Sequence, residues 1–190
     1  MSDLERLKES KYAAAMAREV DLDGQDLSHE DLSGVRVDGL NARHCQLKGA
    51  TLAGAAVSDA EFEGSNFLGA DLSNAQFMDC NFPGTSFADA CMESTSLVAC
   101  SMKGARFERA ILRKAKLDGS LVDDAVFLKA DLRDASCTYA TFRGADFTGA
   151  DLSNADLRNA DFSGAKIQGA TWTGAMLEGA KFDDGVVLET

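Results

Sequence analysis

Histidine and cysteine are the residue types in this sequence best suited to bind a transition metal or to act as nucleophiles. There are two histidines, His29 and His44. The five cysteines are Cys45, Cys80, Cys91, Cys100 and Cys137. No cysteine pair has zinc-ribbon spacing, and no glycine-rich segment follows a phosphate-binding pattern. We therefore predict no metal, no cofactor and no catalytic residue, and we interpret both histidines as surface residues.

Carboxylates are numerous enough for acid–base chemistry, but their spacing does not pair them. The chain has 31 acidic and 19 basic residues, and its net charge of −12 disfavours direct binding to nucleic acid or to an anionic membrane. Nine aspartates recur at multiples of five residues: Asp21, Asp26, Asp31, Asp71, Asp131, Asp146, Asp151, Asp156 and Asp161. Since a repeat explains their placement, the sequence predicts that the protein is not an enzyme.

The cysteine count and the first residues bear on the compartment. An odd number of cysteines without a secretory context indicates free thiols in a reducing cytosol. The sequence begins with charged residues and has no apolar run of membrane-spanning length. We expect a cytoplasmic protein without a signal peptide or a transmembrane segment.

A five-residue repeat from about Val20 onward accounts for these spacings. Every fifth residue from Leu22 to Val187 is apolar and usually large, and the residue two positions before it is usually small. A period of five fits neither a helix nor a strand, so the chain must turn a corner once per repeat. Glycine or asparagine two positions after the large residue suits the positive φ of a type II turn. We expect another turn type where this position holds Ala99, Arg109, Lys129 or Tyr139.

Two runs of the sequence show the repeat in its clearest form. Residues 70–74 read Ala-Asp-Leu-Ser-Asn, and residues 150–157 read Ala-Asp-Leu-Ser-Asn-Ala-Asp-Leu. They match the motif A-(D/N)-L-x-x, and the chain resembles the pentapeptide-repeat family. The resemblance implies an all-β fold, a right-handed quadrilateral parallel β-helix with four repeats per coil. We expect residues 20–190 to form about eight and a half coils and residues 1–19 to form a helical amino-terminal cap.

Sorting the repeat by coil predicts the interior. The large residues separate into two adjacent columns rich in Phe and two columns rich in Leu. Ala42 falls in a Phe column and should leave a thin spot near the first coils. Cys80 and Cys100 should stack inside the coil, whereas Cys91 should face outward and be the most reactive thiol.

The two ends depart from the repeat in different ways. Ser2 and Glu5 have capping-box spacing, and the helix that they begin would bury Leu4 and Leu7 against the first coil. A free amphipathic helix that binds a partner is the alternative. At the carboxyl end the repeat offers an open apolar edge, which predicts a homodimer formed through the last coil. The edge residues are Val186, Val187 and Leu188.

Charge is distributed unevenly along the predicted rod. Residues 21–99 and 146–190 are strongly acidic, and residues 100–145 have nine basic and six acidic side chains. We interpret four aspartates of the second acidic stretch as an acidic face: Asp146, Asp151, Asp156 and Asp161. We name six residues of the middle the basic cluster and treat them as partner-binding candidates: Lys103, Arg106, Arg109, Arg113, Lys114 and Lys116.

Apolar residues occupy several outward positions near the middle of the rod. A contiguous apolar patch beside basic residues is a candidate for binding a partner protein. The apolar candidates are Met78, Val98, Leu121, Val126 and Leu128.

Two functions follow from these features. Some members of the resembled family protect DNA gyrase from quinolones by mimicking DNA, so the resemblance and the acidic charge suggest a DNA-mimicking modulator of type II topoisomerase. The alternative is an interaction scaffold whose partner protein binds the basic and apolar patch at mid-rod. Fold does not decide between them, because function depends on the site.

Overall fold

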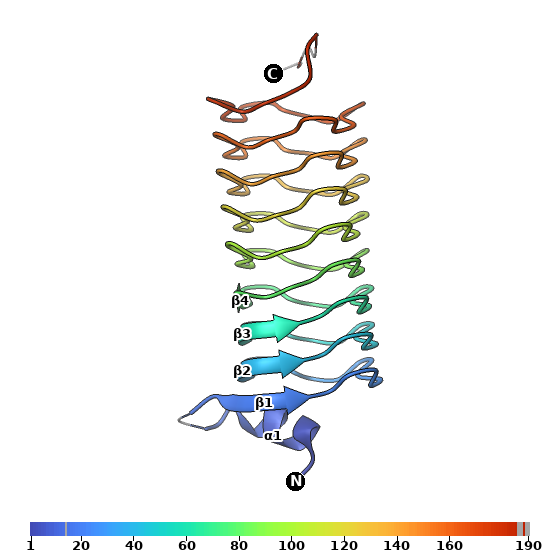
Figure 1. Cartoon of the computed structure of the whole chain (residues 1–190), viewed down its shortest axis with the longest axis vertical. Helices are drawn as coiled ribbons and strands as arrows, with labels where there is room; N and C mark the ends of the chain where they lie inside the picture. Colours follow the sequence, from blue (N-terminus) through green and yellow to red (C-terminus); the bar gives the residue numbers. More distant parts are fainter. Residues whose placement is uncertain (14, 186–187, 189–190) are drawn as a thin grey trace.

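The computed structural model describes residues 1–13, 15–185 and 188 and contains one short helix and four short strands. The elements are α1 (Asp3–Glu9), β1 (Ala17–Asp21), β2 (Arg36–Asn41), β3 (Ala56–Glu61) and β4 (Gln76–Met78). The strands form a parallel sheet in the order β1-β2-β3-β4, in which paired residues are twenty positions apart, as Val37 and Val57 are. Single-residue parallel bridges continue the same offset as far as Lys181. The predicted quadrilateral parallel β-helix is confirmed, and its coils stack into a rod (Figure 1).

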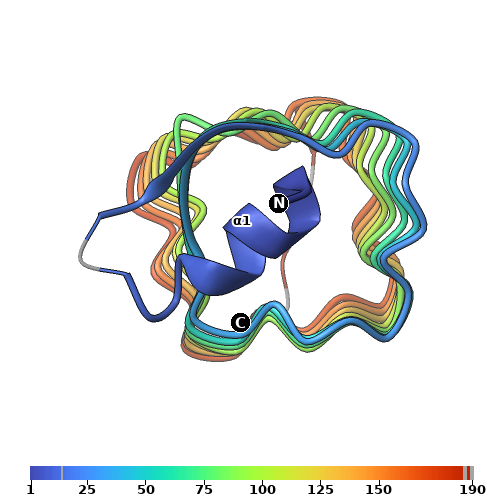
Figure 2. The same ribbon diagram turned by 90° about the horizontal axis from the view of Figure 1, so that it is seen from below.

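The coil has four faces, which we number by their inward-pointing columns. The columns run from Leu22 to Phe182 on face 1, from Leu27 to Ile167 on face 2, from Leu32 to Trp172 on face 3 and from Val37 to Leu177 on face 4. Each face also includes the residue before each column residue and the two residues after it. Strands β1–β3 run around the corner where face 4 leads into face 1. Figure 2 shows the four-sided outline from the amino-terminal end.

Stacked phenylalanines fill faces 1 and 2, as the column analysis predicts. The rings of Phe62 and Phe82 stack on face 1 with centroids 4.8 Å apart, and those of Phe107 and Phe127 stack on face 2 at 4.7 Å. These distances match the spacing of hydrogen-bonded strands, so the backbone ladder sets the ring spacing. Neighbouring columns meet edge to face, as Phe62 and Phe67 do. The rings therefore join the coils both along and across the rod.

The thin spot predicted at Ala42 is present. An apolar cavity of about 10 Å³ lies inside the first coils, and its lining includes Leu7, Leu22, Ala42 and Phe62. This volume is at the lower limit for one water molecule, and the lining offers no hydrogen bonds. Neighbouring side chains therefore fill almost all of the space that a large side chain at position 42 would occupy.

The turn prediction for non-glycine corners is wrong. All four residues concerned have positive φ, between 57° and 59°: Ala99, Arg109, Lys129 and Tyr139. The amides of these four residues donate hydrogen bonds to carbonyls of the next coil. The amide of Ala99 donates to the carbonyl of Asp118 at 3.0 Å, and that of Tyr139 donates to Arg158 at 3.0 Å. Asp79 has the same conformation, with a φ of 53°, so the left-handed corner belongs to the repeat and does not depend on which side chain stands there.

Helix α1 lies across the open end of the first coil (Figure 2). Ser2 and Glu5 form the predicted capping box, and Leu7 is buried in the core while Leu4 packs against it. The Ser10 hydroxyl donates to the Leu7 carbonyl at 2.5 Å and accepts from the Arg36 amide at 2.9 Å. These contacts occupy the apolar side of α1, so the helix covers the first coil. Among the described residues, no helix is long and apolar enough to cross a membrane.

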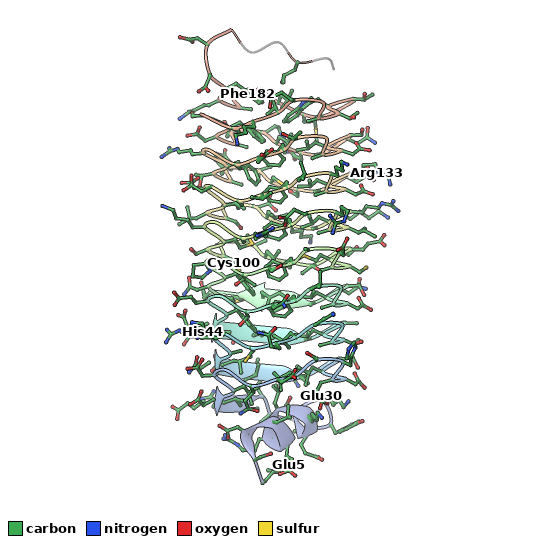
Figure 3. All side chains as sticks on the ribbon, turned by 90° about the vertical axis from the view of Figure 1, so that its right-hand side faces the viewer. Glu5, Glu30, His44, Cys100, Arg133 and Phe182 are labelled. Carbon is green, nitrogen blue, oxygen red and sulfur yellow. The ribbon has the colours of Figure 1, made fainter. Side chains whose placement is uncertain are left out.

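The last coil is less buried than the coils before it. Ile167, Leu177 and Phe182 are only partly buried, and Leu188 packs against the core from beyond the last corner. Figure 3 places Phe182 near the carboxyl end of the stack. Val186 and Val187, which the sequence places at the dimer edge, lie outside the described residues.

Candidate protein-binding surfaces

The histidines lie apart, at corners of different faces. His44 Nδ1 is 3.3 Å from Asp23 Oδ1. Each ring rests where a glycine of the next coil leaves space, since a Cβ on Gly49 or Gly64 would press against His29 or His44 respectively. No group of three histidine, cysteine or acidic side chains that could hold a metal occurs among the described residues.

Four of the five cysteines are buried, and Cys91 is partly exposed. Contact with the Cys100 thiol together with burial raises the pKa of the Cys80 thiol, and burial raises that of Cys137. A thiol with a raised pKa stays protonated and is a poor nucleophile. Figure 3 shows Cys100 within the stack, about halfway along the rod. Cys80 and Cys137 therefore serve packing.

The four aspartates predicted to form an acidic face do not share one. Asp146 lies on face 2, Asp151 on face 3, Asp156 on face 4 and Asp161 on face 1, because each repeat turns a corner. Their carboxylates accept hydrogen bonds from the residue two positions later; the Ser163 hydroxyl donates to Asp161 at 2.6 Å. These aspartates form a ring around the rod, and their side chains stabilise the turns.

The basic cluster also encircles the rod. Its residues lie on face 1 (Lys103), face 2 (Arg106 and Arg109), face 3 (Arg113 and Lys114) and face 4 (Lys116). One partner surface cannot contact them all. The apolar candidates divide as well: Met78 and Val98 lie on face 4, Leu121 lies on face 1, and Val126 and Leu128 lie on face 2.

Face 2 is where basic and apolar candidates come together. Arg106 and Arg109 are exposed, and the half-buried Val126 and Leu128 lie one coil further along. We call these four residues with Glu108 the face 2 surface. Between Asp26 and Gly169 this face has five basic and four acidic side chains, whereas face 1 has four basic and nine acidic ones.

Both arginines of the face 2 surface are held in place by carboxylates. Arg109 forms a two-pronged pair with Asp89 of the preceding coil, at 2.7 Å and 2.6 Å. Arg106 donates from Nε and Nη2 to Glu108 Oε1, at 2.9 Å and 2.6 Å. The paired Arg109 guanidinium holds the pKa of Asp89 below its ordinary value. Such pairs fix the orientation of a guanidinium and reduce the entropy that it loses on binding.

Glu108 is the member of this surface that the sequence interpretation missed. It is 8% exposed, and its Oε2 atom is buried without a hydrogen-bond partner among the described residues. Sorting the outward positions by twenty residues would have found it, because Ala88, Glu108 and Leu128 form one column.

Comparisons with known proteins agree with this architecture. Two family profiles, both described as pentapeptide repeats, match the chain, the first over residues 45–84, 69–97, 90–127 and 125–164 and the second over residues 147–189. No curated protein matches the sequence.

Two solved structures illustrate the likeness. A trypsin-treated form of QnrB1, a plasmid-mediated fluoroquinolone resistance protein, is 22% identical over 88% of this chain and 92% of its own, with a TM-score of 0.55. HetL, a pentapeptide repeat protein involved in heterocyst differentiation regulation in the cyanobacterium Nostoc sp. strain PCC 7120, is 25% identical over 98% of this chain and 99% of its own, with a TM-score of 0.47. At this identity, the likeness to QnrB1 concerns the fold alone.

Proposed function

The chain belongs to the pentapeptide-repeat family, and on that premise we propose that it works without catalysis, by binding a partner protein through the face 2 surface. The observation that carries this proposal is the grouping on one face of two oriented arginines, two aliphatic residues and a buried carboxylate. Arginine is enriched among the residues that carry most of the binding energy at protein interfaces, and the buried centre of an interface is more apolar than the rest of the surface.

The chemistry of the surface specifies the kind of partner. Arg106 uses Nε and Nη2 for Glu108, and Nη1 makes no hydrogen bond to the residues that the structure describes. A partner carboxylate can accept from that nitrogen while an apolar side chain packs on Val126 and Leu128. We therefore expect a partner with an acidic rim around an apolar centre.

Charge reversal on face 2 tests the proposal. We expect Arg106→Glu with Arg109→Glu to abolish retention, in a pull-down, of the partner that the wild-type chain retains. The matched control reverses two arginines elsewhere, Arg133→Glu on face 3 and Arg158→Glu on face 4. Circular dichroism verifies that both variants fold. If the face 2 variant retains the partner as well as the control does, the face 2 surface is not the binding site.

Modulation of a type II topoisomerase is the second candidate function, and face 1 favours it. Four of the nine acidic side chains of this face lie in two pairs, Glu61 with Glu63 and Asp123 with Asp124. Closely spaced carboxylates can imitate the phosphates of DNA. A supercoiling assay with purified DNA gyrase, with and without a quinolone, tests it. We expect the wild-type chain to change the supercoiling activity of gyrase. A variant in which these four residues are replaced by Gln or Asn should have a weaker effect. An unchanged assay at several-fold excess of the chain counts against this function.

Homodimerisation through the last coil remains a further part of the proposal. The partly buried Ile167, Leu177 and Phe182, with Leu188 beside them, present an apolar end that a second copy could cover. Light scattering should give the mass of a dimer at micromolar concentration. The mass of a monomer at that concentration would contradict homodimerisation and would leave the face 2 proposal unaffected.

A further inference from the structure

The backbone ladder of the rod has one interruption on face 4. From Gly24 to Asn159, outside the strands, the amide of each corner residue donates to the coil above; Asn74 donates to Glu93 at 2.9 Å and Gly84 to Lys103 at 3.0 Å. Asp79 is the exception. Its amide donates to no described residue, and the Val98 carbonyl, which stands where the acceptor should be, receives no bond from any described residue.

A change of corner geometry explains the interruption. In β1–β3 the chain rounds the corner between faces 4 and 1 as a continuous strand, whereas β4 already ends at Met78 (Figure 1). From the next coil onward this corner is a tight turn, in which the Cys100 amide donates to the Leu97 carbonyl at 3.1 Å. The amide of Cys80 makes no such bond to Phe77. The ladder is therefore interrupted at the coil where this corner changes from a continuous strand to a tight turn.

Two exposed apolar side chains of face 4 flank this interruption, and Tyr139 and Met176 are exposed further along the same face. Met78 precedes Asp79 and is 64% exposed, and Val98, whose carbonyl is free, is 39% exposed. Ala99 beside them is exposed as well. Exposed Met is flexible and adapts to different apolar partners. We call Met78, Val98 and Ala99 the face 4 strip.

Acidic side chains border the face 4 strip. Asp59 and Asp79 are exposed corner residues of adjacent coils, and neither forms an ion pair with a residue that the structure describes. Asp118 follows Val98 in its column, and its Oδ1 atom accepts from Ser136 and Thr138. Two free carboxylates beside exposed apolar area favour a cationic and apolar ligand.

We propose that the face 4 strip is a second binding surface, which takes a basic amphipathic segment of a partner protein. An apolar side chain of that segment packs on Met78 and Val98. Its lysine or arginine side chains pair with Asp59 and Asp79 and donate to the Val98 carbonyl. The charge preference is opposite to that of the face 2 surface, and the two surfaces lie on opposite sides of the rod, so this inference stands independently of the proposed function.

The test uses a fluorescent peptide of alternating leucine and lysine as the probe and measures its affinity for the full chain by fluorescence anisotropy. We expect Met78→Ser with Val98→Ser to weaken binding at least about tenfold. The control, Ile111→Ser with Met176→Ser, removes two exposed apolar side chains outside the strip, Ile111 on face 3 and Met176 near the carboxyl end of face 4. It should change the affinity less than about twofold. Both variants keep the net charge of the wild type.

A second pair of variants tests the acidic border. Asp59→Asn with Asp79→Asn should weaken binding and reduce its salt dependence, whereas Asp124→Asn with Asp134→Asn, at corners of faces 1 and 3, should do neither. An equal loss of peptide affinity in both double variants would show a general attraction to an acidic rod and would overturn the proposal. So would failure of the wild type to bind the probe, or equal binding of a leucine–glutamate peptide.

Discussion

At the scale of single residues, the main backbone strain is a positive φ at residues other than glycine. Ala99 has a φ of 58° and no side-chain hydrogen bond that could favour this conformation. The left-handed region costs a residue with a Cβ about 1–2 kcal/mol. Ala99 adopts it nevertheless, at a corner where its amide donates to the Asp118 carbonyl.

Replacement of Ala99 by glycine should therefore stabilise the rod. We expect the free energy of unfolding to rise by about 0.5–1 kcal/mol, because relief of strain exceeds the added entropy of the unfolded chain. Urea unfolding measures it. Ala88→Gly is the control, since Ala88 has no positive φ, and it should lower stability. A loss of stability in both variants would show that the positive φ of Ala99 imposes no strain.

The cavity at Ala42 gives a second prediction at this scale. Ala42→Phe would complete the Phe column of face 1, yet only about 10 Å³ is free there. We expect overpacking to lower the free energy of unfolding by about 1–3 kcal/mol. Thermal unfolding shows whether the variant is less or more stable than the wild type. A stabilised variant would mean that the first coils can widen to accept the ring.

The repeat aspartates predict how stability depends on pH. Hydrogen bonds from Ser163, with help from Arg143, lower the pKa of Asp161 to about 2, and bonds from Arg133 and Arg113 lower that of Asp131 to about 2. The ordinary value is 3.8. A carboxyl whose pKa is lower in the folded state stabilises the fold above its unfolded pKa, and this contribution disappears as the pH falls through the folded pKa.

Stability should therefore fall between about pH 4 and pH 2. Asp161→Asn removes one titrating group, so its stability should fall less steeply than that of the wild type over this range. Urea unfolding at a series of pH values measures both curves. Parallel curves would contradict the assignment of Asp161.

At the scale of elements, the sequence was sufficient where the repeat itself sets the structure. The apolar residue at every fifth position defines the columns, and the spacing of Ser2 and Glu5 locates α1. The corner type was not predictable, because the left-handed corner at Ala99 belongs to the stacked repeat rather than to the local residue. The interruption at Asp79 is hidden for the same reason, since the sequence there keeps the repeat.

The outward residues show a different limit of sequence interpretation. Position along the chain placed Arg106 and Lys116 in one cluster, but the corners between them place these residues on opposite faces. Sorting by twenty residues recovers the face of each residue. It does not reveal that Arg106 pairs with Glu108 or that a Glu108 oxygen is buried, because those depend on side-chain conformation.

The cap formed by α1 should act locally. Leu7→Ala removes a buried side chain, which we expect to cost about 2–4 kcal/mol in the first coils. In a solenoid each coil contacts only its neighbours, so distant coils should be unaffected. Hydrogen exchange should accelerate at Leu22, whose amide bonds to Asn41, and stay unchanged at Leu132. Uniform acceleration along the rod would show global rather than local unfolding.

At the scale of the whole molecule, the repeat turns a linear sequence into four surfaces of different character. Face 1 is rich in carboxylates, face 2 joins arginines to aliphatic residues, and face 4 carries an exposed apolar strip. Figure 3 shows side chains projecting from the rod along its length, Arg133 among them. Because faces 2 and 4 lie on opposite sides, the rod could hold two partners of opposite charge at once.

Photocrosslinking from single positions shows directly whether a partner binds face 2. A benzophenone amino acid replaces Leu128 on face 2, or in separate variants Glu63, Ser73 or Ser58 on faces 1, 3 and 4. We expect the partner retained in pull-downs to crosslink from position 128, and we expect the crosslink to disappear with Arg106→Glu and Arg109→Glu. Crosslinks to that partner from the other three positions but not from 128 would contradict it.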